Sequence, residues 1–299
     1  RRGGCKMNGY ESYHPAVQFL YYALAVGFSM VSMHPVVIAA SIIGGMLLFS
    51  IRNTPRKIVE ELFFFFCLFF MLAVMNPIFI HSGETILFFM NDNPVTLEAL
   101  IYGTVSAGML VGVLLWCKCY TTILTTDKFL YLFGKIIPKM GLILSMVFRF
   151  IPLFKLQIHK INQAQKTMGL YATDSIPDKI GGGMRVFDSL LAWSMENSID
   201  TADSMKARGY GLPGRTSFTL FKFQTRDAIV MGIMGVLAVI TLFCFLKGSF
   251  EMYYYPYVAD IKTDHLAVVG YVSVLIFMCI PGILELKEKV LWSYLKSKI

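Results

Sequence analysis

The sequence predicts an all-α membrane protein: a polytopic bundle of about six transmembrane helices, with both termini in the cytoplasm, and a large cytoplasmic platform of amphipathic helices. Of the 299 residues, 56% are hydrophobic and the mean hydropathy is +0.61, which is too apolar for a soluble domain of this length. Several apolar runs approach the roughly 20 residues with which a helix crosses the hydrocarbon of a bilayer. The basic residues gather in one long segment between these runs.

The expected organisation has three parts. We expect four membrane helices over residues 1–126, the helical platform over residues 127–226, and two more membrane helices with a basic tail over residues 227–299. Residues 1–15 lack the short apolar core and the cleavage site of a signal peptide, so no signal peptide is expected.

The first two apolar runs, residues 18–33 and 35–50, are separated by His34-Pro35. Pro35 lacks a backbone donor and disfavours helix at the residue before it, so we expect two helices here. Each is short for a span, and the number of crossings over residues 17–50 stays open.

The next two spans are expected at residues 58–80 and 99–116, and Pro77 should kink or end the first of them. The loop at residues 51–57 is basic, whereas the loop at residues 81–98 has three acidic residues and no Lys or Arg. By the positive-inside rule, the basic loop is cytoplasmic and the acidic loop is external.

The platform contains one stretch, residues 131–154, that is apolar enough to be considered as another span. Lys and Pro residues and Arg149 interrupt it, and the uninterrupted apolar part covers only residues 140–148. We therefore predict an amphipathic helix on or partly in the cytoplasmic face. A second helix should continue through residues 154–165, and glycines 181–183 should form a flexible joint.

A long amphipathic helix is predicted from Met184 to Arg208, because its apolar residues recur at every third or fourth position and give one buried face. The last two spans are expected at residues 228–246 and 266–284. Four tyrosines between these spans are placed like an interfacial aromatic belt, and the lysines after residue 286 indicate a cytoplasmic C-terminus.

Positive charge is concentrated in residues 128–226. This segment holds 14 Lys and Arg against six Asp and Glu, so its net charge of +8 equals that of the whole chain. Such a segment suits anionic lipid headgroups, an acidic protein partner or nucleic acid. Nucleic acid is the least favoured partner, because the segment is tethered between spans and has no nucleic-acid-binding signature.

The sequence carries no motif for catalysis or for a bound cofactor. It has no G-x-x-x-x-G-K-[ST] loop, no G-x-S-x-G elbow and no H-E-x-x-H pair. The predicted spans hold almost no ionisable groups, which argues against an ion-coupled transporter and an intramembrane hydrolase; the histidines at their ends are expected to be capping or interfacial residues. The six cysteines lack metal-finger spacing, and we interpret them as reduced packing residues. We expect no enzyme and no catalytic, cofactor-binding or metal-binding residue.

The polar helix over residues 198–208 ends in Ala207-Arg208-Gly209. One interpretation is a C-cap, with Gly209 in the left-handed conformation and Arg208 near the negative end of the helix dipole. The other is a docking residue: Arg208 lies between two small residues, so its guanidinium can bind carboxylates or carbonyls of a closely approaching partner. Spacing alone favours the cap, and the platform as a whole suits mechanical coupling to another protein.

Residues 201–211, Thr-Ala-Asp-Ser-Met-Lys-Ala-Arg-Gly-Tyr-Gly, and residues 214–218, Gly-Arg-Thr-Ser-Phe, resemble the signature of the transmembrane (T) component of energy-coupling factor transporters. Residues 128–139 and the Arg-Phe-Ile-Pro at residues 149–152 resemble it too, and the likeness covers nearly the whole chain. In that family the T component is a scaffold in the plasma membrane. Two ABC-type ATPase subunits dock beneath it, and a separate substrate-binding membrane (S) subunit packs on its coupling helices.

The resemblance implies two ATPase-coupling motifs. One consists of Ala207, Arg208 and Gly209, and the other of Ala164, Gln165, Met168 and Gly169. The family usually has Arg at the position of Met168, so one of two ionic contacts would here be a flexible apolar contact. The candidate supporting residues are Lys166, Arg215 and Glu196.

The implied function is to transmit ATPase movements to the S subunit for uptake of a vitamin or a transition-metal ion. ATP and Mg would be bound by the partner ATPases, this chain would bind no cofactor, and the lipid bilayer would surround its spans. Two alternatives stay open: a permease subunit that itself lines a substrate pathway, and a membrane anchor for a signalling or enzyme complex. The sequence leaves open which substrate is carried, whether the ATPases are identical and whether the module is shared.

Overall fold

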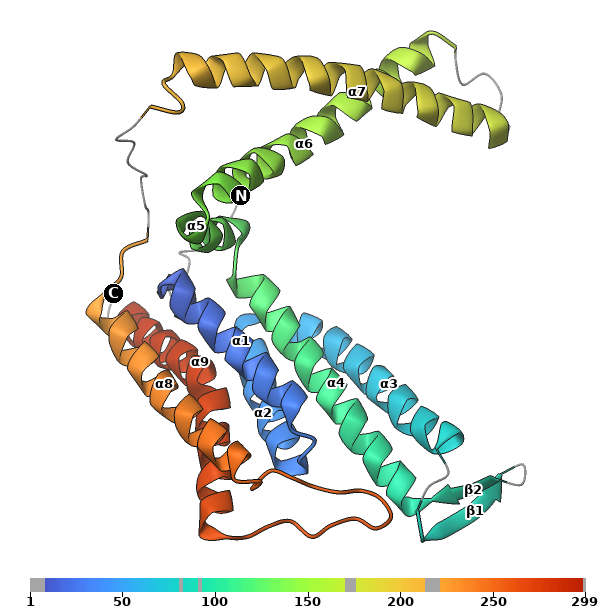
Figure 1. The fold of residues 1–299 in the computed structure, drawn as a ribbon, viewed down its shortest axis with the longest axis vertical. Coiled ribbons are helices and arrows are strands. Elements are labelled where there is room, and N and C mark those ends of the chain that lie inside the picture. Colours follow the sequence, from blue (N-terminus) through green and yellow to red (C-terminus); the bar gives the residue numbers. More distant parts are fainter. Residues whose placement is uncertain (1–8, 81–82, 91–92, 170–175, 213–220, 298–299) are drawn as a thin grey trace. The chain divides into compact units, whose positions relative to one another are not determined.

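The computed structural model describes residues 9–80, 83–90, 93–169, 176–212 and 221–297 (Figure 1). These residues form helices and one two-stranded hairpin. The chain divides into two compact units. The first consists of Arg1–Lys128 and Phe221–Ile299, and the second of Phe129–Leu220. The expected division into three segments stays a prediction.

Unit 1 is a bundle of apolar helices preceded by a short 3-10 turn, Tyr10–Ser12. Its helices are α1 (Pro15–Val31), α2 (Pro35–Arg52), α3 (Pro55–Phe79), α4 (Leu97–Ile123), α8 (Thr225–Leu246) and α9 (His265–Ser297). The first three begin with proline, which costs no hydrogen bond in the first turn of a helix. His34 caps α2, since its Nδ1 accepts a hydrogen bond from the Val36 N–H at 3.3 Å, as expected for a histidine at a span end.

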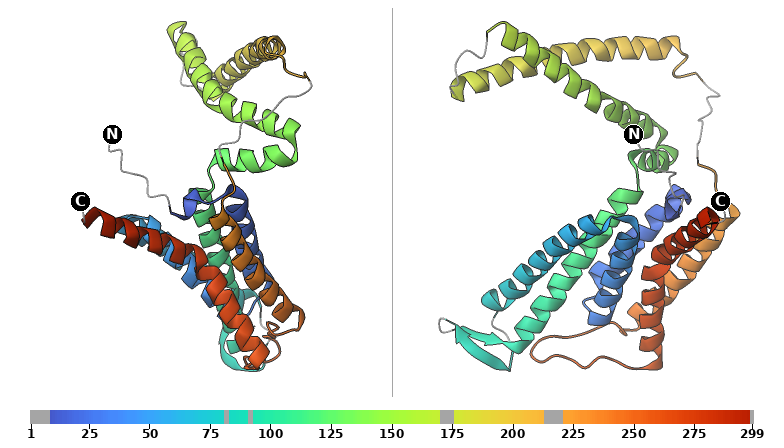
Figure 2. Two further views of the ribbon diagram at one scale, coloured as in Figure 1. Left: turned by 90° about the vertical axis from the view of Figure 1, so that its left-hand side faces the viewer. Right: turned by 180° about the vertical axis from the view of Figure 1, so that it is seen from behind.

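Within unit 1, α2 packs against α4 and α9, while α3 lies along α4 and α8 along α9 (Figures 1 and 2). The α2–α9 contact depends on Gly44, because a Cβ atom there would lie 2.5 Å from the Met278 carbonyl oxygen. Trp116 is fully buried, and its Nε1–H donates to Ser41 Oγ at 3.0 Å. Since α9 contains Pro281, it is bent along its length (Figure 2).

Six of the described helices are long and apolar enough to cross a membrane by length and composition. Five of them, α2, α3, α4, α8 and α9, coincide with predicted spans. The sixth is α6 (Pro138–Thr167), where we predicted a surface helix followed by a second one, whereas α1 is shorter at 17 residues. The prediction of two helices was wrong because Arg149 and Pro152 do not interrupt the helical backbone.

Two loops lie at the end of unit 1 opposite the start of α5 (Thr126–Ile136) (Figures 1 and 2). The acidic loop contains a hairpin that the sequence did not predict, with β1 (Ile86–Met90) antiparallel to β2 (Asn93–Thr96). In the other loop, Tyr254 is buried and its hydroxyl donates to the Met33 carbonyl, so it is a packing residue and not part of an aromatic belt. Tyr253 and Tyr257 are exposed, and their place in an aromatic belt stays a prediction.

Unit 2 contains α6, α7 (Ile176–Ala207) and most of α5 (Thr126–Ile136). The helices α6 and α7 pack together, and the rings of Phe154 and Trp193 meet edge to face at 5.8 Å. Gly134 of α5 and Gly141 of α6 allow a close approach of these two helices, because a Cβ atom at Gly141 would overlap the Gly134 backbone.

The structure corrects the predicted joint at glycines 181–183, which lie inside α7. Each glycine lowers the stability of a helix by about 1 kcal/mol relative to alanine. The helix nevertheless begins at Ile176, before the three glycines. Pro177 is the second residue of α7 and fits its first turn. The long helix predicted from Met184 to Arg208 therefore starts eight residues earlier, at Ile176, and it ends at Ala207, one residue before the predicted end.

Candidate functional site

The helices α6 and α7 end with the same local geometry. Gly169 and Gly209 follow them with φ angles of +70° and +80°, which glycine adopts without steric cost. The Gly209 N–H donates to the Lys206 carbonyl at 2.9 Å, and the Gly169 N–H donates to the Lys166 carbonyl at 3.1 Å. At the end of α7, the Tyr210 N–H also donates to the Met205 carbonyl at 3.0 Å, which completes a Schellman motif. The predicted C-cap at Gly209 is confirmed.

The shared cap places Met168 and Arg208 at equivalent positions, each directly before the left-handed glycine. Met168 is 74% exposed, and Arg208 is exposed as well. Within the described part of the chain, no hydrogen bond or ion pair of the Arg208 guanidinium is found. Its planar set of five donors is thus available to a partner, while the Met168 thioether offers an apolar contact.

The other predicted residues at the end of α6 differ in exposure. Gln165 is only 7% exposed, and its Oε1 has no hydrogen-bond partner among the described residues. Ala164 and Lys166 are exposed. Because Lys166 is two residues before Met168, the two side chains lie on different faces of the helix end. Gln165 therefore belongs to the interior of unit 2 and not to its exposed surface.

The candidate supporting residues are not gathered around Arg208. Glu196 is exposed on α7 and lies twelve residues before Arg208, which is about 18 Å along the helix at 1.5 Å per residue. Arg215 lies outside the described residues. Lys206 forms a 3.4 Å ion pair with Asp203, and its side chain is 76% exposed.

The apolar face predicted for α7 exists, but much of it is exposed and not buried. Its exposed large members are Phe187, Leu191, Met195 and Ile199, and the exposed residues Ile180 and Met184 continue the same row toward the start of the helix. Within unit 2, α6 packs on another face of the helix, through Trp193. The periodicity predicted which residues share a face, whereas burial depends on a neighbour that the sequence pattern does not identify.

Charged residues also lie buried in unit 1, and sequence reasoning missed them. Lys128, Glu285 and Asp227 are each at most 5% exposed. Each of them stands at the edge of an apolar run close to another charged residue, so the sequence gives no sign of which charge is buried. Among the described residues, no three His, Cys, Asp or Glu side chains converge as metal ligands. The expectation that the chain binds no cofactor stays a prediction.

Comparison with known proteins identifies the family. Residues 14–220, more than half of the chain, match the family model of the cobalt transport protein CbiQ. The chain belongs to the CbiQ family. Curated relatives of this CbiQ-family chain carry the name energy-coupling factor transporter transmembrane protein EcfT. The predicted identity as a T component of energy-coupling factor transporters is confirmed by these matches, which also support a multi-pass protein of the plasma membrane.

The relatives differ in how much of the chain they match. The Listeria innocua protein is 26% identical over 193 residues, which are 56% of this chain and 73% of the relative. The Staphylococcus aureus protein is 26% identical over 189 residues, 59% of this chain and 69% of the relative. The Streptococcus equi protein is 31% identical over 113 residues, 37% of this chain and 42% of the relative. Their names describe a transport protein and not a catalyst.

Proposed function

We propose that this chain is the scaffold and energy-coupling subunit of an energy-coupling factor importer. In this proposal, two ABC-type ATPases dock on the cytoplasmic coupling region, and their movement reorients a separate substrate-binding membrane subunit. The observation that carries the proposal is the pair of matching helix ends, in which Met168 and Arg208 stand exposed before left-handed glycines. Together with the family membership, these ends supply two equivalent contact points for two ATPases.

The end of α7 supplies the ionic contact. Ala207 and Gly209 flank Arg208 with the smallest possible side chains, so an ATPase surface can approach the backbone closely. The guanidinium can then bind a carboxylate or main-chain carbonyls with two parallel hydrogen bonds. Truncation of one partner in a buried charged contact costs about 2–5 kcal/mol, which is enough to lose an ATPase during purification.

The end of α6 supplies an apolar contact. Met168, like Arg208, directly precedes a left-handed glycine, but it carries no charge. One ATPase would therefore be bound by an apolar contact and the other by an ionic contact. Two different ATPases, one with an acidic and one with an apolar receptor site, fit this asymmetry. Lys166 adds a point charge on another face of the same helix end.

The exposed apolar face of α7 is the proposed contact of the S subunit. It leads along the helix toward the Arg208 end, so a displacement of that end moves the whole face as one rigid element. The S subunit would carry the cargo, a vitamin or a transition-metal ion. ATP and Mg would be bound by the ATPases, and this chain would take part in neither binding nor hydrolysis.

Affinity purification of the tagged wild-type chain in mild detergent, with identification of its partners by mass spectrometry, tests the proposal. We expect ATPase subunits and one small hydrophobic subunit, with ATP hydrolysis in the purified complex. A chain that binds a substrate by itself would instead be a permease subunit. Recovery of other proteins without any ATPase would indicate a membrane anchor.

A further inference from the structure

The chain leaves unit 1 after Lys128 and returns to it at Phe221. Both of these chain segments contact the same short stretch, residues 10–14, which precedes α1. We call residues 10–14 the clasp, the Lys128 segment the first root and residues 223–227 the second root. Through these contacts, two parts of the chain that are far apart in sequence are held by one five-residue stretch.

The first root is held by a buried ammonium group. Lys128 is 5% exposed, and its Nζ donates to the Glu11 carbonyl at 2.6 Å, to Gln18 Oε1 at 3.0 Å and to the Ile123 carbonyl at 3.3 Å. An ammonium has three donors, and here each has an acceptor. Gln18 in turn donates to the Tyr10 carbonyl at 2.6 Å, which fixes the clasp to α1.

The second root is held by the opposite end of the clasp. The His14 N–H donates to Asp227 Oδ1 at 3.2 Å, and Asp227 Oδ2 accepts from the Gln224 N–H at 2.9 Å in the capping box of α8. The Arg226 guanidinium donates to the Ser12 carbonyl at 3.4 Å. It also lies 5.3 Å from the centre of the Tyr13 ring.

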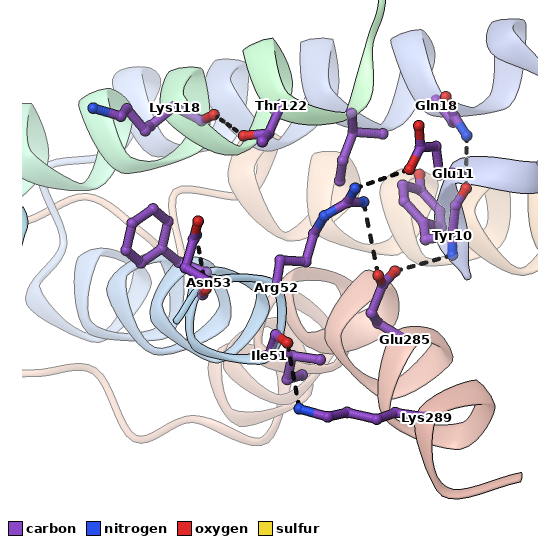
Figure 3. A network of polar contacts seen from close by, with 12 residues as sticks. Tyr10, Glu11, Gln18, Ile51, Arg52, Asn53, Lys118, Thr122, Glu285 and Lys289 are labelled. Atoms are coloured by element: carbon purple, nitrogen blue, oxygen red, sulfur yellow. Dashed lines mark hydrogen bonds and ion pairs between the residues drawn. The ribbon is translucent and has the colours of Figure 1, made fainter. Parts of the chain in front are cut away.

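Ion pairs join the clasp to the end of α2 and to α9 (Figure 3). The Arg52 guanidinium at the end of α2 lies 3.0 Å from the Glu11 carboxylate and 3.7 Å from Glu285 of α9. Glu285 also accepts a hydrogen bond from the Tyr10 N–H at 3.0 Å. Each root is therefore linked through the clasp to α2 and α9.

We propose that the clasp transmits displacements of the coupling helices to α2 and α9, and that Lys128 is the positioning residue on which this transmission depends. Lys128 lies in the first turn of α5, a continuous helix that runs from unit 1 into unit 2. A displacement of α5 therefore moves the ammonium and its three acceptors with it. This inference rests on the proposed function, since it requires ATPases that move the coupling helices.

The proposed transmission depends on the protonation state of Lys128. Burial and the Arg52 charge lower the pKa of Lys128 to about 8, while the Glu11 carboxylate opposes this shift. A neutral amine has two donors for the three acceptors, so one link of the first root is lost on deprotonation. The charged groups that act on the ammonium are Glu11 on the clasp and Arg52 on α2, and Arg52 also pairs with Glu285 of α9.

The test compares hydrogen–deuterium exchange of the complete complex, with its ATPases and S subunit in lipid nanodiscs, before and after trapping with ATP and vanadate. In the wild type, trapping should change exchange at the ends of α6 and α7 and also in the α2 and α9 segments that hold Arg52 and Glu285. In Lys128→Met, the response at the ends of α6 and α7 should persist, and the response in α2 and α9 should be lost. The exchange of unit 1 before trapping should be unchanged. Lys128→Arg keeps the charge and several donors, so it should retain part of the response in α2 and α9.

Lys118→Met is the matched control, because Lys118 pairs with Glu61 at 2.5 Å on an exposed face of unit 1. It should leave both responses intact. Arg226→Gln removes the Arg226 contacts of the second root at an exposed residue and leaves the His14–Asp227 hydrogen bond in place. It is the test variant if Lys128→Met does not assemble. It should weaken the α2 and α9 response. In the double variant Lys128→Met and Arg226→Gln, this response should be no smaller than in Lys128→Met alone.

An α2 and α9 response that persists in Lys128→Met would overturn the proposed role of the clasp alone. If Lys128→Met does not assemble, a response in Arg226→Gln that equals the wild-type response would do the same. A wild-type complex that responds at α6 and α7 but not at α2 and α9 would also overturn it. Absence of ATPases from the purified wild-type chain would instead overturn the proposed function, and the clasp with it.

Discussion

The buried ammonium of Lys128 should make the stability of unit 1 depend on alkaline pH in a specific direction. Its pKa is about 8 in the folded protein and 10.5 when unperturbed. Between these values the unfolded chain binds more protons than the folded chain, so the free energy of unfolding rises with pH. From pH 8 to pH 10 the gain from this one group is about 2 kcal/mol, with 1.36 kcal/mol for each unit of pKa difference.

The perturbation is Lys128→Met, and the assay is thermal unfolding of the detergent-solubilised protein at pH 7, 8, 9 and 10. The difference in stability between wild type and variant should shift by about 2 kcal/mol in favour of the wild type between pH 8 and pH 10. Burial raises the pKa of Tyr10 and of Tyr13, which lowers stability above pH 10, but both tyrosines are present in both proteins. A stability difference that is constant over this range would refute the reasoning about Lys128.

Three further substitutions have expected outcomes. Met168→Arg places a charge against the apolar receptor site proposed for this helix end and should reduce the retention of one of the two ATPases during purification. Trp116→Phe removes the buried bond to Ser41 and should lower the free energy of unfolding by about 1–2 kcal/mol in denaturant titrations. Gly44→Val should prevent α2 from packing on α9, because its Cβ would meet the Met278 carbonyl, and the yield of monodisperse protein should fall sharply.

Each of these substitutions has a matched control elsewhere in the chain. Gln163→Arg adds a charge on an exposed face of α6 and should not change ATPase retention. Trp292→Phe alters a partly exposed tryptophan of α9 and should change stability little. Gly27→Val adds side-chain atoms where a Cβ has nothing within 4 Å. Equal effects in a substitution and its control would contradict the explanation given for that site.

Local rules predicted the features that depend on neighbouring residues in the sequence. Gly209 was expected to end a helix in the left-handed conformation, and it does so with a φ of +80°. His34-Pro35 was expected to separate two helices, and α2 begins at Pro35. The apolar runs located five of the six helices that are long enough to cross a membrane.

Features that depend on distant residues were not predicted. The face of α7 has the periodicity of a buried face, but its exposure depends on what packs against it. Within the clasp, Glu11 accepts a hydrogen bond from Lys128 through its carbonyl and pairs with Arg52 through its carboxylate, and no local pattern indicates that these distant residues meet. Helix propensity misled us at glycines 181–183, because favourable residues on both sides outweigh the cost of three glycines in one helix.

The most direct test of the coupling role is the retention of ATPases by Arg208→Glu, compared with wild type and with Lys206→Glu in parallel purifications. Lys206 is a suitable control because it is a highly exposed basic residue near the same helix end. We predict that Arg208→Glu loses at least one ATPase and most of the ATP hydrolysis. Lys206→Glu should keep both ATPases and the wild-type rate of hydrolysis. Full retention of both ATPases by Arg208→Glu would contradict the assignment of this helix end as an ATPase contact.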